Sequence, residues 1–398
     1  MMKKVPLGSI VEIKKGKKVN PICENPTNKI RLIQMEDLRN QNQKKFCEAN
    51  RKYTYAKKED IIIAWDGAYA GIVNYGLEGV IGSTLALLKI KNKEEILTPY
   101  LGKFLQSKFS YLKNTRTGAT IPHISRNALE KIQVPIFDPD IQKAIVEVLN
   151  KAQSLINKRK KQIALLDQLA QSLFLDMFGD LTPSNNKVNF IRLGDYSTHI
   201  SSGSTPKGGR KTYVPSGIPL IRSQNVRMNQ LNLDDVVYID RSVHEKMKRS
   251  QLQYKDVLFN ITGASIGRSA VYHLSNQEAN VNQHVCIIRL KPEINPYFLV
   301  YYFSSKRFQD SIRLMNAGAT RKALNYTQIK NFKIPYLPIA LQNKFEKFVI
   351  KIEQQKQTLH SSLLQLETFS NSLMQRAFRG ELFNNVRRVK EENPVYTE

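Results

Sequence analysis

Two stretches of the chain carry apolar side chains at alternating spacings of four and three residues, which predicts long amphipathic helices that pair with other helices. They run from about residue 139 to 180 and from 338 to 380. The predicted coiled-coil positions, including one polar interruption in each helix, are Ile141, Ile145, Val148, Leu155, Arg159, Leu166, Leu169 and Leu173 in the first, and Leu341, Phe345, Phe348, Ile352, Gln355, Leu359, Leu366, Phe369 and Leu373 in the second.

Start and stop signals bound both stretches. Asp138 can cap a helix whose first residue is Pro139, and Pro338 takes the same place in the second stretch. Gly179 and Gly380 follow the last apolar positions, where a left-handed glycine commonly ends a helix. Each helix would be roughly 60 Å long, at 1.5 Å per residue.

The apolar stripes also predict how the helices pair. In an antiparallel arrangement, midpoint to midpoint, Leu155 faces Leu359 and Leu169 faces Phe345, so that apolar positions meet throughout. Parallel pairing would instead place Arg159 against Leu359. The alternative is two separate amphipathic helices, each lying on its own domain. Antiparallel pairing is the favoured hypothesis, because such length is unusual for a simple core helix.

The rest of the chain is predicted to be mixed and rich in strands. "DIIIAW" at 60–65 and "DVLFNI" at 256–261 are short β-branched and aromatic runs that lead into Asp-Gly and Thr-Gly turns. Four residues, two of them directly before a proline, are predicted to cap short helices: Thr98, Asn295, Ser125 and Asn325. Four glycines are predicted to form the turns: Gly67, Gly71, Gly263 and Gly267.

The sequence contains an internal duplication, with two copies of one unit in tandem. "TGATIPHISRNALEKIQVPI" at 117–136 returns as "AGATRKALNYTQIKNFKIPY" at 317–336, and "EDIIIAWDGAYAG" at 59 is matched by "KDVLFNITGASIG" at 255. The offset drifts from 186 to 200 in the first part of each copy and stays at 200 along the helices. The helical part is therefore fixed in length, whereas the loops of the first part diverge.

Together these patterns predict an α+β fold. Two β-rich mixed modules stand in tandem, each followed by a long helix, and the helices form an antiparallel coiled coil with pseudo-two-fold symmetry. The predicted boundaries are 1–138 for module 1, 139–180 for the first helix, 181–337 for module 2, 338–380 for the second helix and 381–398 for a C-terminal tail.

The charge of the chain points to a polyanionic partner. Sixty-one Lys and Arg residues against 34 Asp and Glu residues give a net charge of +27, which favours nucleic acid first and a membrane surface second. No apolar run approaches about 18 residues, so no membrane span or signal peptide is predicted and a cytoplasmic location is expected. Cys23, Cys47 and Cys286 lack close spacing and are predicted to be inert thiols of a reducing compartment.

Motifs for catalysis are weak. "NPYF" at 295 is similar to a base-holding motif of amino-methyltransferases, but it is better explained as a helix start, and no glycine-rich loop suited to S-adenosylmethionine precedes it. "GSTPKGGRKT" at 203 departs from a phosphate-binding loop at Arg210. The six histidines form no close metal-binding pair. We therefore predict a chain without catalytic apparatus and without metal.

The repeated organisation resembles the specificity subunit of type I restriction-modification systems. The resemblance covers residues 5–383 and is carried most specifically by "SLFLDMFGD" at 172–180 and "SLMQRAFRGEL" at 372–382, which correspond to the family's conserved regions. It departs in module 1, where Trp65 and Asp66 stand in place of Ile261 and Thr262.

That resemblance implies a non-catalytic subunit that binds double-stranded DNA, with each module reading one half of a bipartite gapped site and the helices setting the gap. It implies two HsdM-type methyltransferase subunits as partners and, in the full complex, HsdR-type restriction subunits. S-adenosylmethionine would bind the methyltransferase, and ATP and Mg the restriction partner. The alternatives are a basic coiled-coil scaffold and a stand-alone DNA-modifying enzyme with such modules.

Loops rather than strand interiors carry the predicted DNA contacts, because strand interiors form the core. In module 1 the candidates are Lys17, Lys18, Gln34, Trp65, Asp66, Tyr69, Arg116, Thr117 and His123. In module 2 they are Lys207, Arg210, Lys211, Arg222, Gln224, Asn225, Thr262, Ser265, Arg268, Gln283, Arg321 and Lys322. Each residue alone is equally well explained as a solvated side chain, so the prediction rests on the set.

Overall fold

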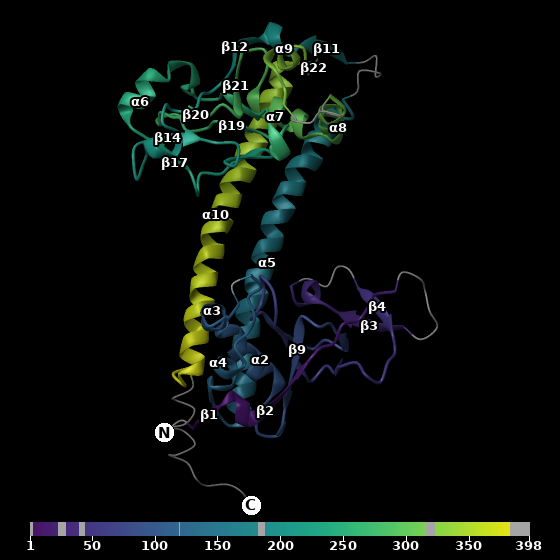
Figure 1. Ribbon diagram of the computed structural model, residues 1–398. Helices are drawn as coiled ribbons and strands as arrows, with labels where there is room; N and C mark the ends of the chain where they lie inside the picture. Colours follow the sequence, from purple (N-terminus) through teal and green to yellow (C-terminus); the bar gives the residue numbers. More distant parts are fainter. Residues whose placement is uncertain are drawn as a thin grey trace, which may run out of the picture. The chain divides into compact units, whose positions relative to one another are not determined.

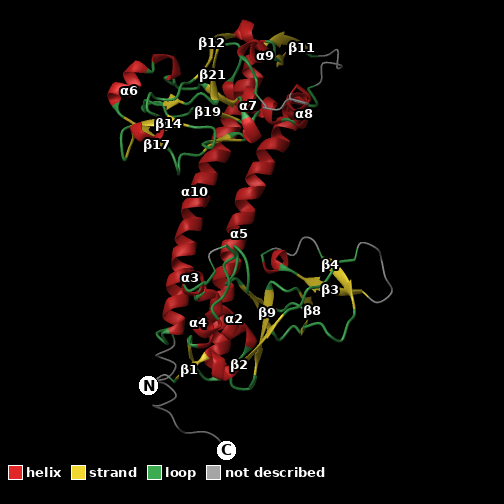
Figure 2. Cartoon of the chain, viewed as in Figure 1, coloured by secondary structure: helices red, strands yellow, loops and turns green. Residues whose placement is uncertain are grey.

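The computed structural model describes residues 3–22, 29–39, 44–118, 120–181, 188–315 and 323–382. Contacts divide the chain into two compact units: unit 1 comprises residues 1–160 and the chain from 361 onward, and unit 2 comprises 161–360. Each unit contains one β-rich module and a part of both long helices, α5 and α10 (Figure 1). The strands lie in the modules, as the colours of Figure 2 show.

Module 1 is built on two four-stranded sheets and a two-stranded one. The first has the order β2-β9-β6-β7 and is antiparallel, the second has the order β4-β3-β8-β5 with β3 and β8 parallel, and β1 pairs with β10. The strands are β1 Lys4–Pro6, β2 Val11–Lys15, β3 Lys29–Ile33, β4 Lys45–Glu48, β5 Tyr55–Ala56, β6 Ile61–Ala64, β7 Val73–Tyr75, β8 Gly79–Ile81, β9 Leu85–Ile90 and β10 Gln133–Pro135. The short helices are α1 Leu7–Ile10, the 3-10 turn Met35–Leu38, α2 Thr98–Ser107, α3 Phe109–Asn114 and α4 Arg126–Glu130.

Strand β6 explains why its sequence is apolar throughout instead of alternating. Successive side chains of a strand point to opposite faces, and both faces of β6 are covered. Ile61 and Ile63 join the cluster that includes Tyr100 of α2, and Ile62 and Ala64 join a second cluster under the other sheet. The strand therefore fixes the turn that follows it at residues 65–71.

Module 2 repeats most of this topology. Its antiparallel sheet has the order β12-β21-β18-β19, β11 pairs with β22, and β14 and β20 form the parallel pair of a second sheet. That sheet has the order β13-β17-β14-β20, and β15 and β16 form a further pair. The strands are β11 Asn189–Arg192, β12 Ser197–Ser202, β13 Tyr213–Val214, β14 Ile218–Ile221, β15 Val226–Arg227, β16 Gln230–Leu231, β17 Val237–Ile239, β18 Val257–Asn260, β19 Ser269–Val271, β20 Asn280–Val281, β21 Val285–Leu290 and β22 Lys333–Tyr336. The helices are α6 Arg241–Lys246, α7 Pro296–Ser304, α8 Lys306–Met315 and α9 Tyr326–Lys330, with 3-10 turns at Gly209–Thr212, Leu193–Tyr196, Lys248–Ser250 and Gly263–Ser265.

Three of the four predicted caps of short helices are confirmed. Asn295 accepts from the backbone of Tyr297 at the start of α7, Ser125 caps α4, and Asn325 forms a reciprocal capping box at α9. The interpretation of Thr98 as a cap is wrong. Thr98 is already the first residue of α2, and its hydroxyl donates instead to the Glu59 carbonyl oxygen at 2.6 Å.

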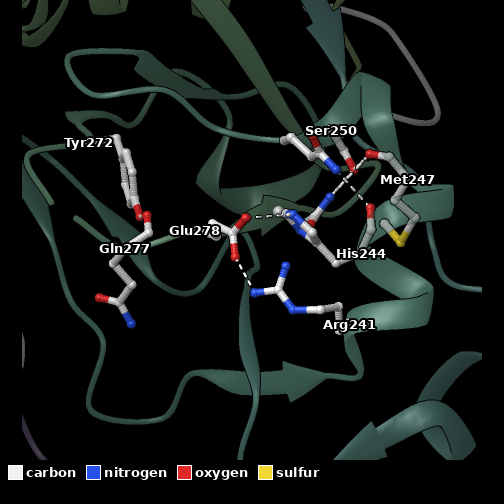
Figure 3. A network of polar contacts seen from close by, with 9 residues as sticks. Arg241, His244, Met247, Ser250, Tyr272, Gln277 and Glu278 are labelled. Atoms are coloured by element: carbon white, nitrogen blue, oxygen red, sulfur yellow. Dashed lines mark hydrogen bonds and ion pairs between the residues drawn. The ribbon is translucent and has the colours of Figure 1, made fainter. Parts of the chain in front are cut away.

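In unit 2, the helix α6 is held against β20 by a network of polar side chains (Figure 3). Arg241 donates to Glu278 at 2.6 Å, and the buried His244 lies between Glu278 and Asn280. Asn280 also donates to Ser250 at 2.8 Å. The network supplies hydrogen bonds to the buried His244, Ser250 and Asn280, since buried polar groups need partners.

The long helices lie within the predicted ranges but end two residues earlier. α5 is Pro139–Phe178 and α10 is Ile339–Phe378, and Gly179 and Gly380 lie just beyond their ends with φ of +68° and +78°. The prediction that Pro338 is the first residue of the second helix is wrong, because α10 begins at Ile339. A buried glutamine attaches each helix to its module in the same way. Gln142 accepts from the Leu97 backbone at 2.9 Å, and Gln342 accepts from the Asn295 backbone at 2.8 Å.

The helices pair antiparallel within each unit. In unit 1 the C-terminal Phe378 of α10 packs edge-on against Tyr100 and Phe104 of α2, in the cluster that also contains Ile145 of α5. In unit 2 the C-terminal end of α5 meets the N-terminal part of α10, where Phe174 contacts Phe345 with ring centroids 5.4 Å apart. The antiparallel hypothesis is confirmed.

Which side chains form the seam between the helices was predicted only in part. Leu155 and Leu169 are each 51% exposed, and Phe348 and Phe369 are 39% and 57% exposed. Gln355 is exposed as well. Interpreting these five as seam positions is wrong. The residue that follows is buried instead, at Ile156, Ala170, Val349, Lys356 and Ser370. Of the other predicted positions, Ile145, Phe345 and Ile352 are buried, and Ile141, Val148, Arg159, Leu166, Leu173, Leu341, Leu359, Leu366 and Leu373 are half-buried.

Packing against the modules accounts for this one-residue difference. Ile145 and Leu149 belong to the core cluster of module 1, and Phe345 and Val349 belong to that of module 2. Each module thereby fixes the rotation of the helix that leaves it. The apolar face of each helix is wide enough to place either the predicted residue or the one after it in the seam. Periodicity alone could therefore not decide which of the two is buried.

The midpoint-to-midpoint register is wrong too. It would place Lys160 opposite Gln354, whereas the Lys160 ammonium lies 2.8 Å from Glu367, thirteen residues further along α10. In unit 2 the partner of Asp167 is Lys356, at 2.7 Å. The anchoring of Phe378 and its neighbours in module 1 supplies the physical reason, because the register follows the modules and not the helix midpoints.

The thiols of the described residues are buried. Burial raises the pKa of Cys47, and it raises the pKa of Cys286 to about 12. Both therefore stay protonated and unreactive near neutral pH, as predicted. Cys23 lies outside the described residues. No helix among the described residues has the length and apolar character needed to cross a membrane.

Candidate nucleic-acid interface

In module 1 the turn after β6 gathers most of the predicted contact residues. Gly67 has a φ of +94° and donates from its backbone to Pro122, and Asp66 pairs through the backbone with His123. His123 in turn exchanges two backbone hydrogen bonds with Thr117, of 2.8 and 2.9 Å. The turn at residues 66–69 and the described residues 117, 118 and 120–123, far apart in sequence, therefore lie next to each other.

Cations surround this turn. The Arg116 guanidinium donates to the carbonyl oxygens of Ala68 and Ala70, and these two hydrogen bonds hold the turn in place. The Arg39 guanidinium lies over the Tyr69 ring, 4.2 Å from its centroid, and Tyr69 is 43% exposed. A cation over an aromatic face is a stable exposed arrangement. The surface thus offers a ring and positive charge side by side.

The strand ends beside this turn complete the cluster. Lys17 bridges to Gly82 through the backbone, and Lys17 and Lys18 are exposed. Gln34 begins the 3-10 turn after β3 and accepts from the Lys45 ammonium at 2.7 Å. Trp65 does not share this exposure. It is 9% exposed and lies in the core cluster of module 1, so its interpretation as a base contact is wrong.

Module 2 has a concave surface at the equivalent place. A hollow of about 390 Å³ is lined by Ser223, Gln224, Thr262, Gly263, Ala264, Ser265, Arg268 and His284. Gly263 and Gly267 have φ of +70° and +87°, which confirms both as turn formers, as Gly67 and Gly71 are in module 1. The Thr262 hydroxyl lies 2.7 Å from Nδ1 of His284.

The walls of this hollow are held by hydrogen bonds. Arg222 donates to the Asp235 carbonyl oxygen at 2.7 Å, and Gln224 bonds the Asp235 carboxylate. Asn225 is fully buried and uses its amide on Asn232, Asp235 and the Arg222 backbone. The prediction that Asn225 reads a base is therefore wrong, since its polar atoms serve the turn.

The remaining module 2 candidates lie around this hollow or outside the description. Gln283 is exposed, 3.1 Å from His284, and bonds Thr205. The exposed basic side chains on the loop after Thr205 are Lys207, Arg210 and Lys211. Arg321 and Lys322 lie outside the described residues, although Ala323 directly after them pairs with Thr262.

Sequence reasoning missed several residues at these surfaces. Lys15 forms an ion pair with Asp66, Arg39 stacks on Tyr69, and Tyr326 bonds Ser202 at 2.5 Å. All three contacts depend on which strands and loops meet in the fold. His284, which lines the hollow of module 2, was missed as well. For His284 the sequence did contain a signal, because it lies 200 residues after Thr84, at the offset of the repeat.

No group of three or more metal-ligating side chains occurs among the residues that the structure describes. The family model for the type I restriction modification DNA specificity domain matches residues 1–165 and 185–368. The chain belongs to the type I specificity-subunit family. That domain recognises DNA, and the relatives are specificity subunits, which are non-catalytic.

Curated relatives of the family span most of the chain. The MjaVIII specificity subunit of Methanocaldococcus jannaschii is 23% identical over 396 residues, which cover 95% of this chain and 92% of that protein. The EcoBI specificity subunit of Escherichia coli is 22% identical and covers 81% and 74%.

Solved structures of the family share the fold. The S subunit from M. genitalium superposes with a TM-score of 0.55 at 16% identity, covering 95% of this chain and 96% of that one. A chain from a study of complex assembly and conformational transition of the type I R-M system gives 0.57 at 15% identity, covering 96% and 98%. The tandem α+β fold with its long helices is confirmed.

Proposed function

We propose that each module reads one half of a bipartite DNA site, and that the long helices set the unread gap between the halves. The observation that carries the proposal is the repeated turn after the buried strand, residues 65–71 in module 1 and 261–267 in module 2. The backbone of this turn is alike in both modules, with glycines at equivalent places, whereas its side chains differ. A common scaffold with different side chains suits two readers of different sequences.

The helices suit a spacing role because of their length and their fixed register. At 1.5 Å per residue, 40 residues extend about 60 Å, and one turn of DNA extends about 34 Å. A net charge of +27 supplies the phosphate-binding term that holds such a chain on DNA. The helix length is the same in both copies of the repeat, as a spacer requires.

We further propose that two methyltransferase subunits dock on the helices, one at each unit. Each unit exposes large apolar side chains there: Leu155, Leu364 and Phe369 in unit 1, and Leu165, Leu169 and Phe348 in unit 2. Leu169 and Phe369 are 200 residues apart, so the repeat supplies an equivalent apolar position in each unit. Exposed apolar strips on helices are typical of surfaces that a partner helix covers.

Mapping methylated bases across the host genome, with and without the gene, tests this function. We expect one bipartite gapped motif to lose methylation when the gene is deleted and to regain it when the gene is restored. Methylation of a single continuous motif, or no change while the protein and its methyltransferase are both present, would overturn the proposal.

A further inference from the structure

Asp66 and Lys15 form an ion pair within the module 1 surface. The Lys15 ammonium lies 3.0 Å from Oδ2 of Asp66, and the two side chains are 52% and 26% exposed. Asp66 stands in the turn after β6, and Lys15 is the last residue of β2. Neither side chain is buried, so an acceptor and an ammonium lie side by side and are partly accessible to solvent.

The equivalent of Lys15 in module 2 is Ser202. Lys15 pairs with Ala86 across β2 and β9, and Ser202 pairs with Cys286 across β12 and β21. Ala86 and Cys286 are separated by the 200-residue offset of the repeat. Module 2 thus carries a hydroxyl where module 1 carries an ammonium.

The equivalent of Asp66 is Thr262. The residue before Asp66 donates its backbone N–H to Thr84, and the residue before Thr262 donates to His284, again 200 residues further on. Thr262 uses its hydroxyl on the His284 ring. A charged acid–lysine pair in module 1 is therefore replaced by two hydroxyls in module 2, on the same backbone.

A carboxylate at this place is poorly suited to the DNA backbone. It repels phosphate and has no hydrogen to donate, and Asp66 is the only acid among the predicted contacts of module 1. In a DNA groove its natural partner is an exocyclic amino group, the N4 amine of cytosine or the N6 amine of adenine. The ion pair with Lys15 lowers the cost of bringing the negative charge there.

The neighbour Lys15 decides between these two bases. A C·G pair presents in the major groove the cytosine amine, then O6 and N7 of guanine, so that one donor stands beside two acceptors. An acceptor beside an ammonium complements that order. An A·T pair also has an acceptor, thymine O4, beside the adenine amine, but the thymine methyl group follows where C·G offers a second acceptor, and adenine N7 on the other side of the amine repels the carboxylate.

We propose that the Asp66–Lys15 pair reads one C·G base pair in the half-site of module 1. Asp66 Oδ1 accepts from cytosine N4, and Lys15 donates to O6 and N7 of the paired guanine. This inference rests on the proposed function and adds a residue-level code for one of its two halves. Module 2, with Ser202 and Thr262 at these positions, reads a different pattern there.

The test compares methylated motifs in cells that express the chain with its methyltransferase. The wild-type motif should contain an obligatory C·G pair in one half. Asp66→Asn should allow A·T at that one position, because an amide both donates to N7 and accepts from N6 of adenine. Lys15→Arg should keep C·G, Lys15→Gln should relax the same position, and the other half and the gap should not change.

Purified methyltransferase complexes give the matching affinity measurement. For the wild type, replacing that C·G by A·T should weaken binding about 10- to 100-fold, and for Asp66→Asn the ratio should fall below about 3-fold. A substitution in the other half-site must cost both proteins the same, which shows that the variant is folded and bound in register.

The outcomes separate the two proposals. If the wild type methylates no bipartite motif, the function itself fails. If it does, and both Asp66→Asn and Lys15→Gln keep the wild-type motif and only lower the extent of methylation, the pair is a structural ion pair and this inference is overturned.

Discussion

The Lys356 ammonium lies 2.7 Å from the Asp167 carboxylate and joins α10 to α5 in unit 2. Glu353 adds a second bond of 2.9 Å, and the lysine side chain is only 6% exposed. At the equivalent position of unit 1, 200 residues earlier, the seam holds Ile156. A buried lysine in a mostly apolar seam fixes register at a cost in stability.

Replacing the two partners should have opposite effects. Lys356→Met should leave the free energy of unfolding unchanged or raise it, by up to about 4 kcal/mol, because a well-packed apolar side chain needs no desolvation of a charge. Asp167→Asn should lower it by about 1 kcal/mol, since Asp167 is 56% exposed and Glu353 remains. Denaturant unfolding measures both, and a large loss in Lys356→Met would contradict the register role.

The contribution of the Lys356 ion pairs to the free energy of unfolding should decrease at alkaline pH. Burial by itself lowers the pKa of Lys356, but the bonds from Asp167 and Glu353 outweigh it and hold the pKa above its usual value. The contribution is therefore complete below the unfolded value of about 10.4 and is lost as pH rises through the folded pKa. The stability difference between wild type and Lys356→Met should be flat from pH 8 to 10 and shift against the wild type above. Buried tyrosines such as Tyr272, whose pKa burial raises to about 12, are common to both proteins.

Arg289 holds a fully buried carboxylate in module 2. Its Nε and Nη2 each lie 2.8 Å from one oxygen of Asp256, whose side chain is 0% exposed. Arg289→Ala should cost about 3–5 kcal/mol, because it leaves a buried charge without its counter-ion. Thermal unfolding measures the loss. Adding Asp256→Asn to that variant should recover part of it, and no recovery would mean that packing rather than charge is responsible.

Phe369 should contribute to docking and not to folding. It is 57% exposed on α10, so Phe369→Glu should reduce co-purification of the methyltransferase subunit at least tenfold while thermal unfolding stays unchanged. Asn371→Glu adds the same charge two residues away at another exposed position and should leave assembly intact. Equal assembly of both variants would exclude this strip as a docking surface.

Lys17 should bind phosphate without reading sequence. Lys17→Gln should weaken binding to all DNA sequences alike and reduce the slope of log K against log salt by about one. Lys57→Gln removes an exposed lysine just before β6, at the end of that strand away from the turn, and should leave the slope unchanged. A change of motif in Lys17→Gln would assign it to base reading instead.

Local sequence signals predicted the helices, strands and turns. The side chains that contact the candidate site residues from other strands were not predicted. The cap at Asn295 and the turn glycine Gly263 act within a few residues of their own position, so their roles can be read directly. Lys15 was missed because it meets Asp66 only when β2 pairs with β9. Trp65 and Asn225 were assigned to DNA because they stand beside turns, although the folded modules bury them.

The amino-acid sequence by itself determined the repeat, the extent of α5 and α10 and the turns, because periodicity, proline and glycine act over short distances along the chain. Only the tertiary structure decided that Ile156 and not Leu155 enters the seam, that Lys356 meets Asp167, and that Asp66 meets Lys15. Each of these follows from how a module packs on its helix or from how distant strands align. The sequence is compatible with several helix rotations and strand alignments, which differ only in the contacts that they bury.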